Sequence, residues 1–275
     1  MSADITWHVR GIDTRRWDVQ AGSNHTSDVG TRQAQVEIPQ RHGVIVEPLQ
    51  VFEAFTVTLE FLTKGDMVAL RTAEHELKRV LYAPGLVLGL TAGGLTTSAP
   101  AKCLGLSQGE FFPDRSAKFT AQVQVPGAFL RGVSVDIGPT VVTTGATVNL
   151  PALAAGSGPV ADAVLRFRGP LSVVAVVDDA SATGNSWSGT ALVSTDYLFI
   201  DLATLTAWRS TVATAWTPGG TDVSGGLSRQ ALGSLQLQPT PSIADPAVAE
   251  CSVTVTGTGF GATTALTVRA QPAYL

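Results

Sequence analysis

The sequence predicts a mainly β protein, in which an N-terminal β domain with one packed helix is followed by a purely β sandwich. Apolar and polar residues alternate in residues 54–61 and 118–125, residues 67–82 show a helical period, and short Val/Thr/Leu-rich segments recur after residue 132. A period of two indicates half-buried strands, whereas apolar residues recurring every three or four positions indicate an amphipathic helix. The two domains are expected to span residues 1–132 and 133–275.

The first domain begins its regular pattern in the stretch Ala54–Phe61. Here Phe55, Val57, Leu59 and Phe61 point to the same side of an extended chain. A second alternating stretch, residues 118–125, closes with Pro126 and Gly127. Both stretches are typical of strands with one buried face.

One helix is predicted over about residues 67–82. Asp66 precedes it as an N-cap, Glu74 and Lys78 are spaced for an ion pair, and Pro84 stops it. The predicted apolar face consists of Met67, Leu70, Leu77, Val80 and Leu81. Such a stripe has to be buried, so the helix is expected to lie on the sheet formed by the neighbouring strands.

The second domain is predicted to consist of short strands separated by turn residues, as in a sandwich or jelly roll. Apart from a short turn near residues 203–208, no helix is expected there. The candidate strand segments are residues 141–150, 163–167, 171–177, 188–193, 197–200, 232–237, 249–256 and 264–269.

Composition excludes several classes of function. A formal net charge of −4, without any cluster of Lys or Arg, argues against direct binding of nucleic acid. No apolar run suits a secretory signal or a membrane span, so we expect a product that is first soluble in the cytoplasm. Cys103 and Cys251 lie too far apart for a metal-binding motif and are expected to be buried free thiols, so no metal and no cofactor are predicted.

Several motifs that could be catalytic also have simpler structural interpretations. Gly105–Gly109 matches the GxSxG form around Ser107, but the following Phe111–Pro113 does not suit the helix that a nucleophile elbow requires. The adjacent Asp178 and Asp179 end a strand segment, where carboxylates commonly bond to turn backbone. The histidines gather in the first half of the chain, and His75 falls on the polar side of the helix. A non-catalytic protein is therefore favoured.

The order of features resembles the distal tail proteins of long, non-contractile-tailed bacteriophages, especially those of actinobacterial hosts. The features are Trp17–Val19 in an N-terminal leader, the turn Ile38–Gly43, the strand, helix and β return, Leu198–Asp201 in the second domain, and the ending Thr267–Leu275. The likeness covers nearly the whole chain and rests on order and spacing. Gln40 departs from the glycine that relatives often have.

The resemblance implies a structural protein of the virion tail tip. In that family the first domain forms a hexameric ring and the second is a galectin-like sandwich. Pro39, Arg41 and Gly43 would correspond to the turn that enters the ring domain. The implied partners are copies of the chain itself, the tail tube protein, and the tail-tip hub and tape measure proteins.

Two other functions remain open at the level of the sequence. A carbohydrate-binding module for host adsorption, recognising a cell-wall glycan, would use Trp187, Trp208 or Trp216 to stack on sugar rings. Large aromatic residues more often belong to the core, which favours the structural interpretation. A cell-wall hydrolase acting through Ser107 is the third hypothesis.

Overall fold

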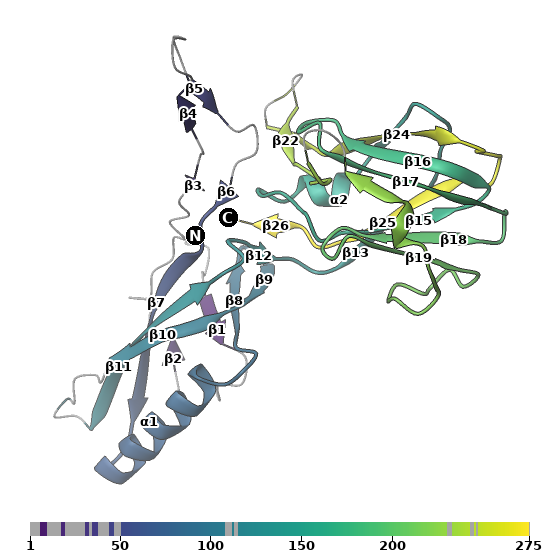
Figure 1. The fold of residues 1–275 in the computed structure, drawn as a ribbon. Helices are drawn as coiled ribbons and strands as arrows, with labels where there is room; N and C mark the ends of the chain where they lie inside the picture. Colours follow the sequence, from purple (N-terminus) through teal and green to yellow (C-terminus); the bar gives the residue numbers. More distant parts are fainter. Residues whose placement is uncertain are drawn as a thin grey trace. The chain divides into compact units, whose positions relative to one another are not determined.

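A computed structural model describes the fold of the chain (Figure 1). The described residues are 6–9, 18–19, 31–32, 35–37, 44–46, 51–107, 112, 115–229, 233–242, 245 and 247–274. The chain divides into two compact units, residues 1–132 with 274–275, and residues 133–273.

The described part of the first unit contains two larger antiparallel sheets and two sheets of two short strands each. One of the larger sheets includes the order β1-β8-β9-β12, and the other has the order β10-β11-β7-β2. The last strand of the chain, β26 (Ala273–Tyr274), spans the division between the units. The strand bounds in the first unit are β1 Thr6–Val9, β2 Asp18–Val19, β3 Thr31–Arg32, β4 Gln35–Glu37, β5 Val44–Val46, β6 Val51–Phe52, β7 Phe55–Lys64, β8 Val87–Ala92, β9 Leu95–Pro100, β10 Lys102–Ser107, β11 Ser116–Val125 and β12 Leu130–Arg131.

Strands β7 and β11 form the centre of the first unit. They pair along ten residues, from Phe55 opposite Val125 to Lys64 opposite Ser116. Alternate residues of both strands are buried, as the period of two predicts, and Phe55, Phe61 and Phe119 are among the most deeply buried side chains. The predicted strands at residues 54–61 and 118–125 are thereby confirmed.

The predicted helix is α1 (Met67–Leu81), one residue shorter than expected. The Asp66 side chain accepts a hydrogen bond from the backbone N–H of Ala69 at 2.8 Å, which supplies the predicted N-cap. Nζ of Lys78 lies 2.6 Å from a carboxylate oxygen of Glu74, as their spacing predicts.

The buried face of α1 differs from the prediction at its first residue. Leu70, Leu77 and Leu81 pack into the core, whereas the side chain of Met67 is 55% exposed. Met67 opens the first turn, directly after the cap, and the next residue, Val68, is likewise exposed. Ala73 joins the buried face instead.

Two separate sheets of two short strands each precede β7 in the first unit. Strand β3 pairs with β6, and β4 pairs with β5 from Gln35 opposite Val46 to Glu37 opposite Val44. The predicted family-like turn at residues 38–43, with Pro39, Arg41 and Gly43, joins β4 to β5 in the sequence and lies outside the described residues.

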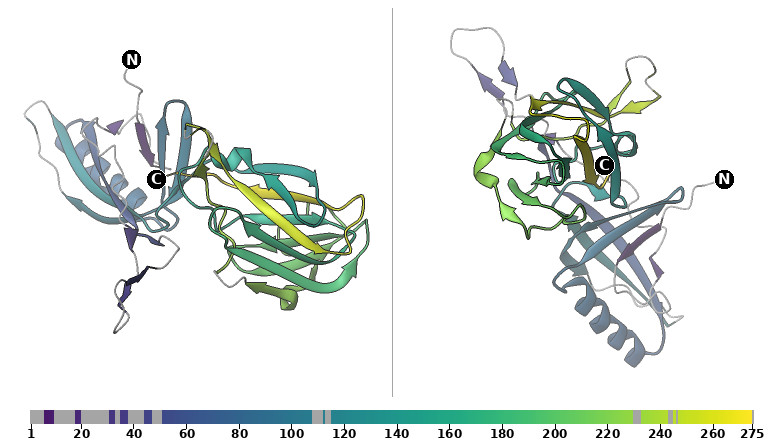
Figure 2. Two further views of the ribbon diagram at one scale, coloured as in Figure 1. Left: turned by 90° about the horizontal axis from the view of Figure 1, so that it is seen from above. Right: turned by 90° about the vertical axis from the view of Figure 1, so that its right-hand side faces the viewer.

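The second unit is a sandwich of two antiparallel sheets, shown from two further sides in Figure 2. One sheet has the order β13-β25-β15-β18-β19-β20 and the other β14-β24-β16-β17-β21, with a separate ribbon of β22 and β23. The bounds are β13 Val135–Val141, β14 Ala146–Asn149, α2 Pro151–Ala154, β15 Val164–Arg168, β16 Leu171–Asp178, β17 Gly184–Leu192, β18 Tyr197–Asp201, β19 Thr206–Ser210, β20 Thr221–Asp222, the 3₁₀ turn Ser224–Gly226, β21 Leu227–Arg229, β22 Thr240–Pro241, β23 Ala249–Glu250, β24 Ser252–Thr258 and β25 Ala265–Ala270.

The predicted segments at residues 141–150, 203–208 and 232–237 differ from the structure, and the described residues of the last belong to no strand of the two sheets or of the ribbon. The expected strand over residues 141–150 is divided, because β13 ends at Val141 and β14 begins only at Ala146, on the other sheet. The expected helical turn near residues 203–208 is instead a tight hairpin connection into β19. Leu205 adopts a φ of 54°, and the Asp201 carboxylate accepts the backbone N–H of Ala203 at 2.8 Å.

Cys103 and Cys251 are both buried and free, as predicted. Within the described ranges, no helix has the length and apolar character needed to cross a membrane.

Candidate functional site

One outward face of the second unit gathers arginine and aromatic side chains. It belongs to the sheet that contains β15, where Leu165 and Phe167 are fully buried and Arg166 and Arg168 therefore point to the opposite side. Arg166 is paired in register with Thr267 of β25 and Phe199 of β18. The alternation of a single strand thus places two cations on one face.

The segment after β19 folds back over this face and covers part of it. The ring of Trp208 stacks on that of Phe199, with centroids 5.3 Å apart and an interplanar angle of 3°. Its Nε1–H donates to the carbonyl oxygen of Ala215 at 2.9 Å. Trp216 meets Phe199 edge to face at 5.5 Å. These contacts fix residues 213–216 against the sheet through aromatic packing.

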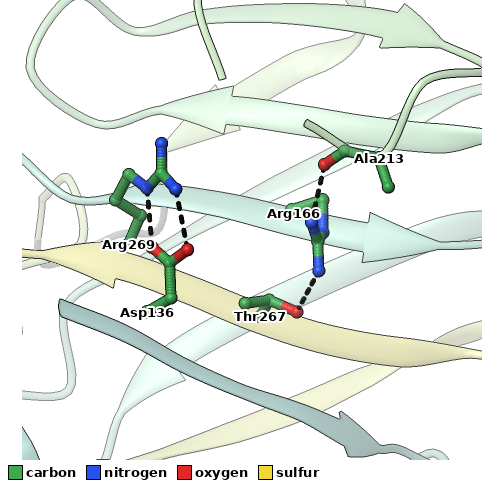
Figure 3. A network of polar contacts seen from close by, with 5 residues as sticks. All are labelled: Asp136, Arg166, Ala213, Thr267 and Arg269. Carbon is green, nitrogen blue, oxygen red and sulfur yellow. Dashed lines mark hydrogen bonds and ion pairs between the residues drawn. The ribbon is translucent and has the colours of Figure 1, made fainter. Parts of the chain in front are cut away.

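The guanidinium group of Arg166 is hydrogen-bonded to the same segment (Figure 3). One terminal nitrogen donates to the carbonyl oxygen of Ala213 at 2.6 Å, and the other donates to Oγ1 of Thr267 at 2.9 Å. The guanidinium carbon also lies 4.8 Å from the ring centroid of Trp216. Burial lowers the pKa of Arg166 from its usual value. An arginine nevertheless stays protonated, so a partly buried positive charge remains at this point.

A second arginine on this face is paired with a carboxylate. Arg269 of β25 donates to both carboxylate oxygens of Asp136 on β13, at 2.6 and 2.7 Å (Figure 3). The hydrogen bonds from Arg269 lower the pKa of Asp136, and the same bonds raise the pKa of Arg269. The guanidinium carbon of Arg269 lies 4.1 Å from the Trp216 ring centroid. Trp216 is therefore in contact with two arginines.

Beside Arg166 the face is hollowed into a cavity of about 310 Å³. It is lined by Pro139, Val141, Arg166, Arg168, Tyr197, Ala213, Ala262, Thr263, Ala265 and Thr267. The lining combines two arginines, two hydroxyl-bearing threonines and a tyrosine with small apolar residues. Among the described residues that line the cavity there is no Asp or Glu.

A β-bulge shapes one wall of this cavity. The pairing of β13 with β25 shifts between Ile137 and Thr140, so that Gly138 and Pro139 together oppose Thr267. Gly138 has a φ of 105°, and a Cβ atom there would lie 2.6 Å from the carbonyl oxygen of Leu266. Glycine is therefore required at the bulge that brings Pro139 to the cavity.

The three tryptophans predicted from the sequence occupy different environments. Trp187 is 2% exposed and donates from Nε1 to the carbonyl oxygen of Val223 at 3.0 Å, while Trp208 is 3% exposed. Both are core residues whose indole N–H groups are satisfied. Only Trp216 of these three is half-exposed, and the two arginines already lie over its ring.

The sequence interpretation did not select Arg166 and Arg168. A signal was present, because Arg166 alternates with Leu165 and Phe167 in the predicted strand at residues 163–167, and Arg168 follows that strand directly in the same alternation. Asp136, Ala213 and Thr267 also belong to this face. They lie far from β15 in the sequence, and a pattern within one segment does not reveal such neighbours.

The other candidate chemical groups have structural positions. Ser107 is the last residue of β10, and its Oγ donates to the carbonyl oxygen of Thr120 at 3.1 Å. It is paired with Thr120 of β11, and the next described element after β10 is this strand and not the helix that a nucleophile elbow requires. Over the described part of the chain, no group of three or more His, Cys, Asp or Glu residues is arranged to hold a metal ion.

Asp178, at the end of β16, bonds to its turn as predicted, whereas the following Asp179 bonds to side chains of β24 and not to turn backbone. Asp178 is fully buried and accepts hydrogen bonds from the N–H and Oγ of Ser181 and from the N–H of Gln238, at 2.7 to 3.0 Å. Burial raises the pKa of Asp178, and these hydrogen bonds oppose the rise. Asp179 accepts from the hydroxyl groups of Ser252 and Thr254, each at 2.6 Å.

Comparison with solved structures identifies the fold. The chain aligns with the crystal structure of SPP1 Dit (gp 19.1), described as a paradigm of the hub adsorption apparatus in phages that infect Gram-positive bacteria. The alignment covers 99% of this chain and 100% of the other, with a TM-score of 0.60 and 14% sequence identity. The chain has the fold of a phage Dit protein. The predicted resemblance to distal tail proteins is thus confirmed at the level of the fold.

The other comparisons are weaker or negative. Chains of the phage p2 baseplate in its activated conformation, with Ca and with Sr, align at TM-scores of 0.37 and 0.36 and with 9% and 8% identity. They cover 94% of this chain, but the likeness is too weak to indicate a shared fold. The sequence matches no protein-family profile and no curated protein.

Proposed function

We propose that this chain is a distal tail protein, a structural component of the bacteriophage tail tip. The observation that carries the proposal is the likeness to the Dit hub protein of SPP1, which extends over the whole of both chains. The hypothesised role is a hexameric hub ring between the tail tube and the tail-tip and host-attachment proteins. Its partners would be copies of this chain, the tail tube protein and the tape measure protein.

The first unit offers features suited to ring formation. A closed ring repeats one heterologous interface by rotation, and exposed edge strands provide ready pairing surfaces for such an interface. Strand β10 is the edge of its sheet, and its Leu104 is a 50% exposed leucine. We propose that this edge contributes to the contact between neighbouring copies. The second unit, as the galectin-like domain of the family, would lie outside the ring.

A structural role also agrees with the positions of the candidate nucleophile and carboxylates. Ser107, Asp178 and Asp179 all serve the local structure through hydrogen bonds to neighbouring backbone or hydroxyl groups. We therefore propose that the protein acts by assembly rather than by catalysis.

The test is the mass of the purified protein in solution, measured by light scattering, followed by negative-stain microscopy. The expected result is a particle of about six times 28.5 kDa that appears as a ring with a central hole. A monomer at the highest attainable concentration, together with no ring after addition of the tail tube protein, would contradict the proposal.

A pair of matched variants tests the proposed edge. Leu104→Glu places a charge on β10, and Leu95→Glu places the same charge on a comparably exposed leucine of β9, at 44% exposure. Burying an unpaired carboxylate in an interface is strongly unfavourable, so L104E is expected to yield smaller particles while L95E retains the ring. Equal assembly by both variants would exclude β10 from the interface.

A further inference from the structure

The cavity beside Arg166 has a positive lining that the assembly role does not use. Arg166 and Arg168 are two residues apart on β15, which separates their Cα atoms by about 7 Å on the same face of the sheet. Both line the cavity of about 310 Å³, with no carboxylate among its described lining residues. The Asp136 carboxylate on this face pairs with Arg269, and its charge also acts on Arg166, whereas in the described part of the chain it forms no ion pair with Arg168.

Both arginines keep unused donors. A guanidinium group has five N–H donors. The hydrogen bonds of Arg166 occupy one on each terminal nitrogen, and that of Arg168 occupies Nε, which donates to the carbonyl oxygen of Ser194 at 3.1 Å. Among the described residues, the two terminal nitrogens of Arg168 have no hydrogen-bond partner. The planar end of Arg168 is therefore available for a bidentate contact.

The other residues that line the cavity suit a ligand in which a small uncharged organic group carries an anionic group. Tyr197 and the hydroxyl groups of Thr263 and Thr267 can hydrogen-bond, while Pro139 and Ala265 offer apolar surface. A volume near 310 Å³ lies at the lower end of the range for small-molecule pockets, which fits one monosaccharide-sized group. Arginine recognises phosphate and carboxylate through paired N–H donors, and such contacts are among the stronger hydrogen bonds in proteins.

We propose that this cavity binds a monosaccharide-sized ligand that carries a phosphate or carboxylate group. Arg168 makes the bidentate contact with the anion, and Arg166 supplies a fixed second positive charge held by Ala213 and Thr267. The inference goes beyond assembly, and it does not depend on whether the protein forms a ring.

The experiment titrates the full chain with glucose 1-phosphate, glucuronate and glucose, using isothermal calorimetry at low salt. Glucose 1-phosphate and glucuronate separate the two anion chemistries, and glucose is the uncharged control. Saturable binding of at least one charged sugar, with no binding of glucose, is the expected result. Absence of saturable binding for both charged sugars up to about 10 mM, or equal binding of glucose, would overturn the proposal.

Matched variants locate the site. Arg168→Gln removes the exposed guanidinium from the cavity, and Arg229→Gln removes an exposed arginine from β21, on the other sheet of the same unit. We expect R168Q to raise the dissociation constant of the charged sugar at least about tenfold, because a charge-assisted bidentate contact is lost. R229Q should leave it within about twofold. Equal affinities for R168Q and the unmodified protein would overturn the assignment.

A spectroscopic readout guards against an effect of R168Q on folding. The Nε–Hε resonance of Arg168, assigned by its absence from the R168Q spectrum, is expected to shift as the charged sugar is added to the unmodified protein. A titration that shifts other arginine resonances but leaves this one unmoved would place the ligand elsewhere and refute the proposal.

Discussion

Replacing Arg166 with Met tests whether this arginine holds the segment after β19 onto the sheet. Met keeps an unbranched apolar stem but removes the guanidinium that donates to Ala213 and Thr267 and lies over Trp216. A hydrogen bond from a charged donor contributes about 1.5–3 kcal/mol, and a cation–π contact about 0.5–1 kcal/mol at an exposed site. Since these terms overlap at one side chain, we expect R166M to lower the free energy of unfolding by about 2–4 kcal/mol.

The assay is calorimetric or chemical unfolding of the full chain, following the transition of the second unit. For a unit of this size, a loss of 2–4 kcal/mol corresponds to a fall in Tm of roughly 6–12 °C. Arg168→Met is the matched control, because the exposed Arg168 makes a single hydrogen bond, to Ser194. R168M is expected to cost less than about 1 kcal/mol.

A second measurement reports on the segment itself. If Arg166 holds Trp216 against the sheet, R166M should make tryptophan fluorescence more accessible to quenching by iodide, while R168M should not. The reasoning would be refuted if R166M and R168M unfolded with the same midpoint and showed the same quenching.

Three further predictions follow from buried and paired groups. Asp178→Ala leaves the N–H groups of Ser181 and Gln238 without this acceptor and should lower the free energy of unfolding in denaturant by about 2–4 kcal/mol. Asp179→Ala, at an exposed residue, should lower it by less than about 1 kcal/mol, and equal losses would contradict this prediction. The pKa of Asp136 is lowered in the folded protein by Arg269, so the ion pair stabilises above the ordinary value of 3.8 and loses its effect as pH falls below it. The stability difference between the unmodified protein and Asp136→Asn should therefore shrink in acid unfolding experiments; a constant difference would contradict it. Burial, with the nearby charges of Asp178 and Asp179, raises the pKa of Cys251 to about 12, so this thiol should resist a disulfide reagent at pH 8 until the protein is unfolded.

Local patterns predicted much of the first unit. The helix at residues 67–82 was recoverable because its cap, its ion pair and its stop signal all lie within twenty residues of one another. Only Met67 was misplaced, since periodicity alone does not reveal that the first residues of this helix are exposed. Strands β7 and β11 were equally recoverable, because a period of two reports directly on a half-buried strand.

The site in the second unit was not predicted, because its parts come from separate strands. Arg166 reaches Ala213, 47 residues away, and Thr267, 101 residues away. The tight turn at Leu205, a residue with no special preference for positive φ, also concealed the hairpin that leads to Trp208. The same search for aromatic residues singled out Trp187 and Trp208, whose size and apolar character suit a core equally well.

The negative net charge of the chain does not conflict with the proposal that a cavity on the second unit binds an anion. Screening at physiological salt limits exposed charges to a range of about 8 Å, so a ligand in the cavity is influenced by Arg166 and Arg168 more than by distant carboxylates. A nucleic acid duplex, in contrast, requires many neutralising cations along its backbone, and a chain of net charge −4 without a basic cluster does not supply them. If both proposals hold, an acidic ring would not retain passing DNA, and the cavity of the second unit would still bind one small anion. The net charge of the whole chain bears on the proposed ring, whereas the local charge of one cavity bears on the proposed ligand. An experiment can therefore refute either proposal without refuting the other.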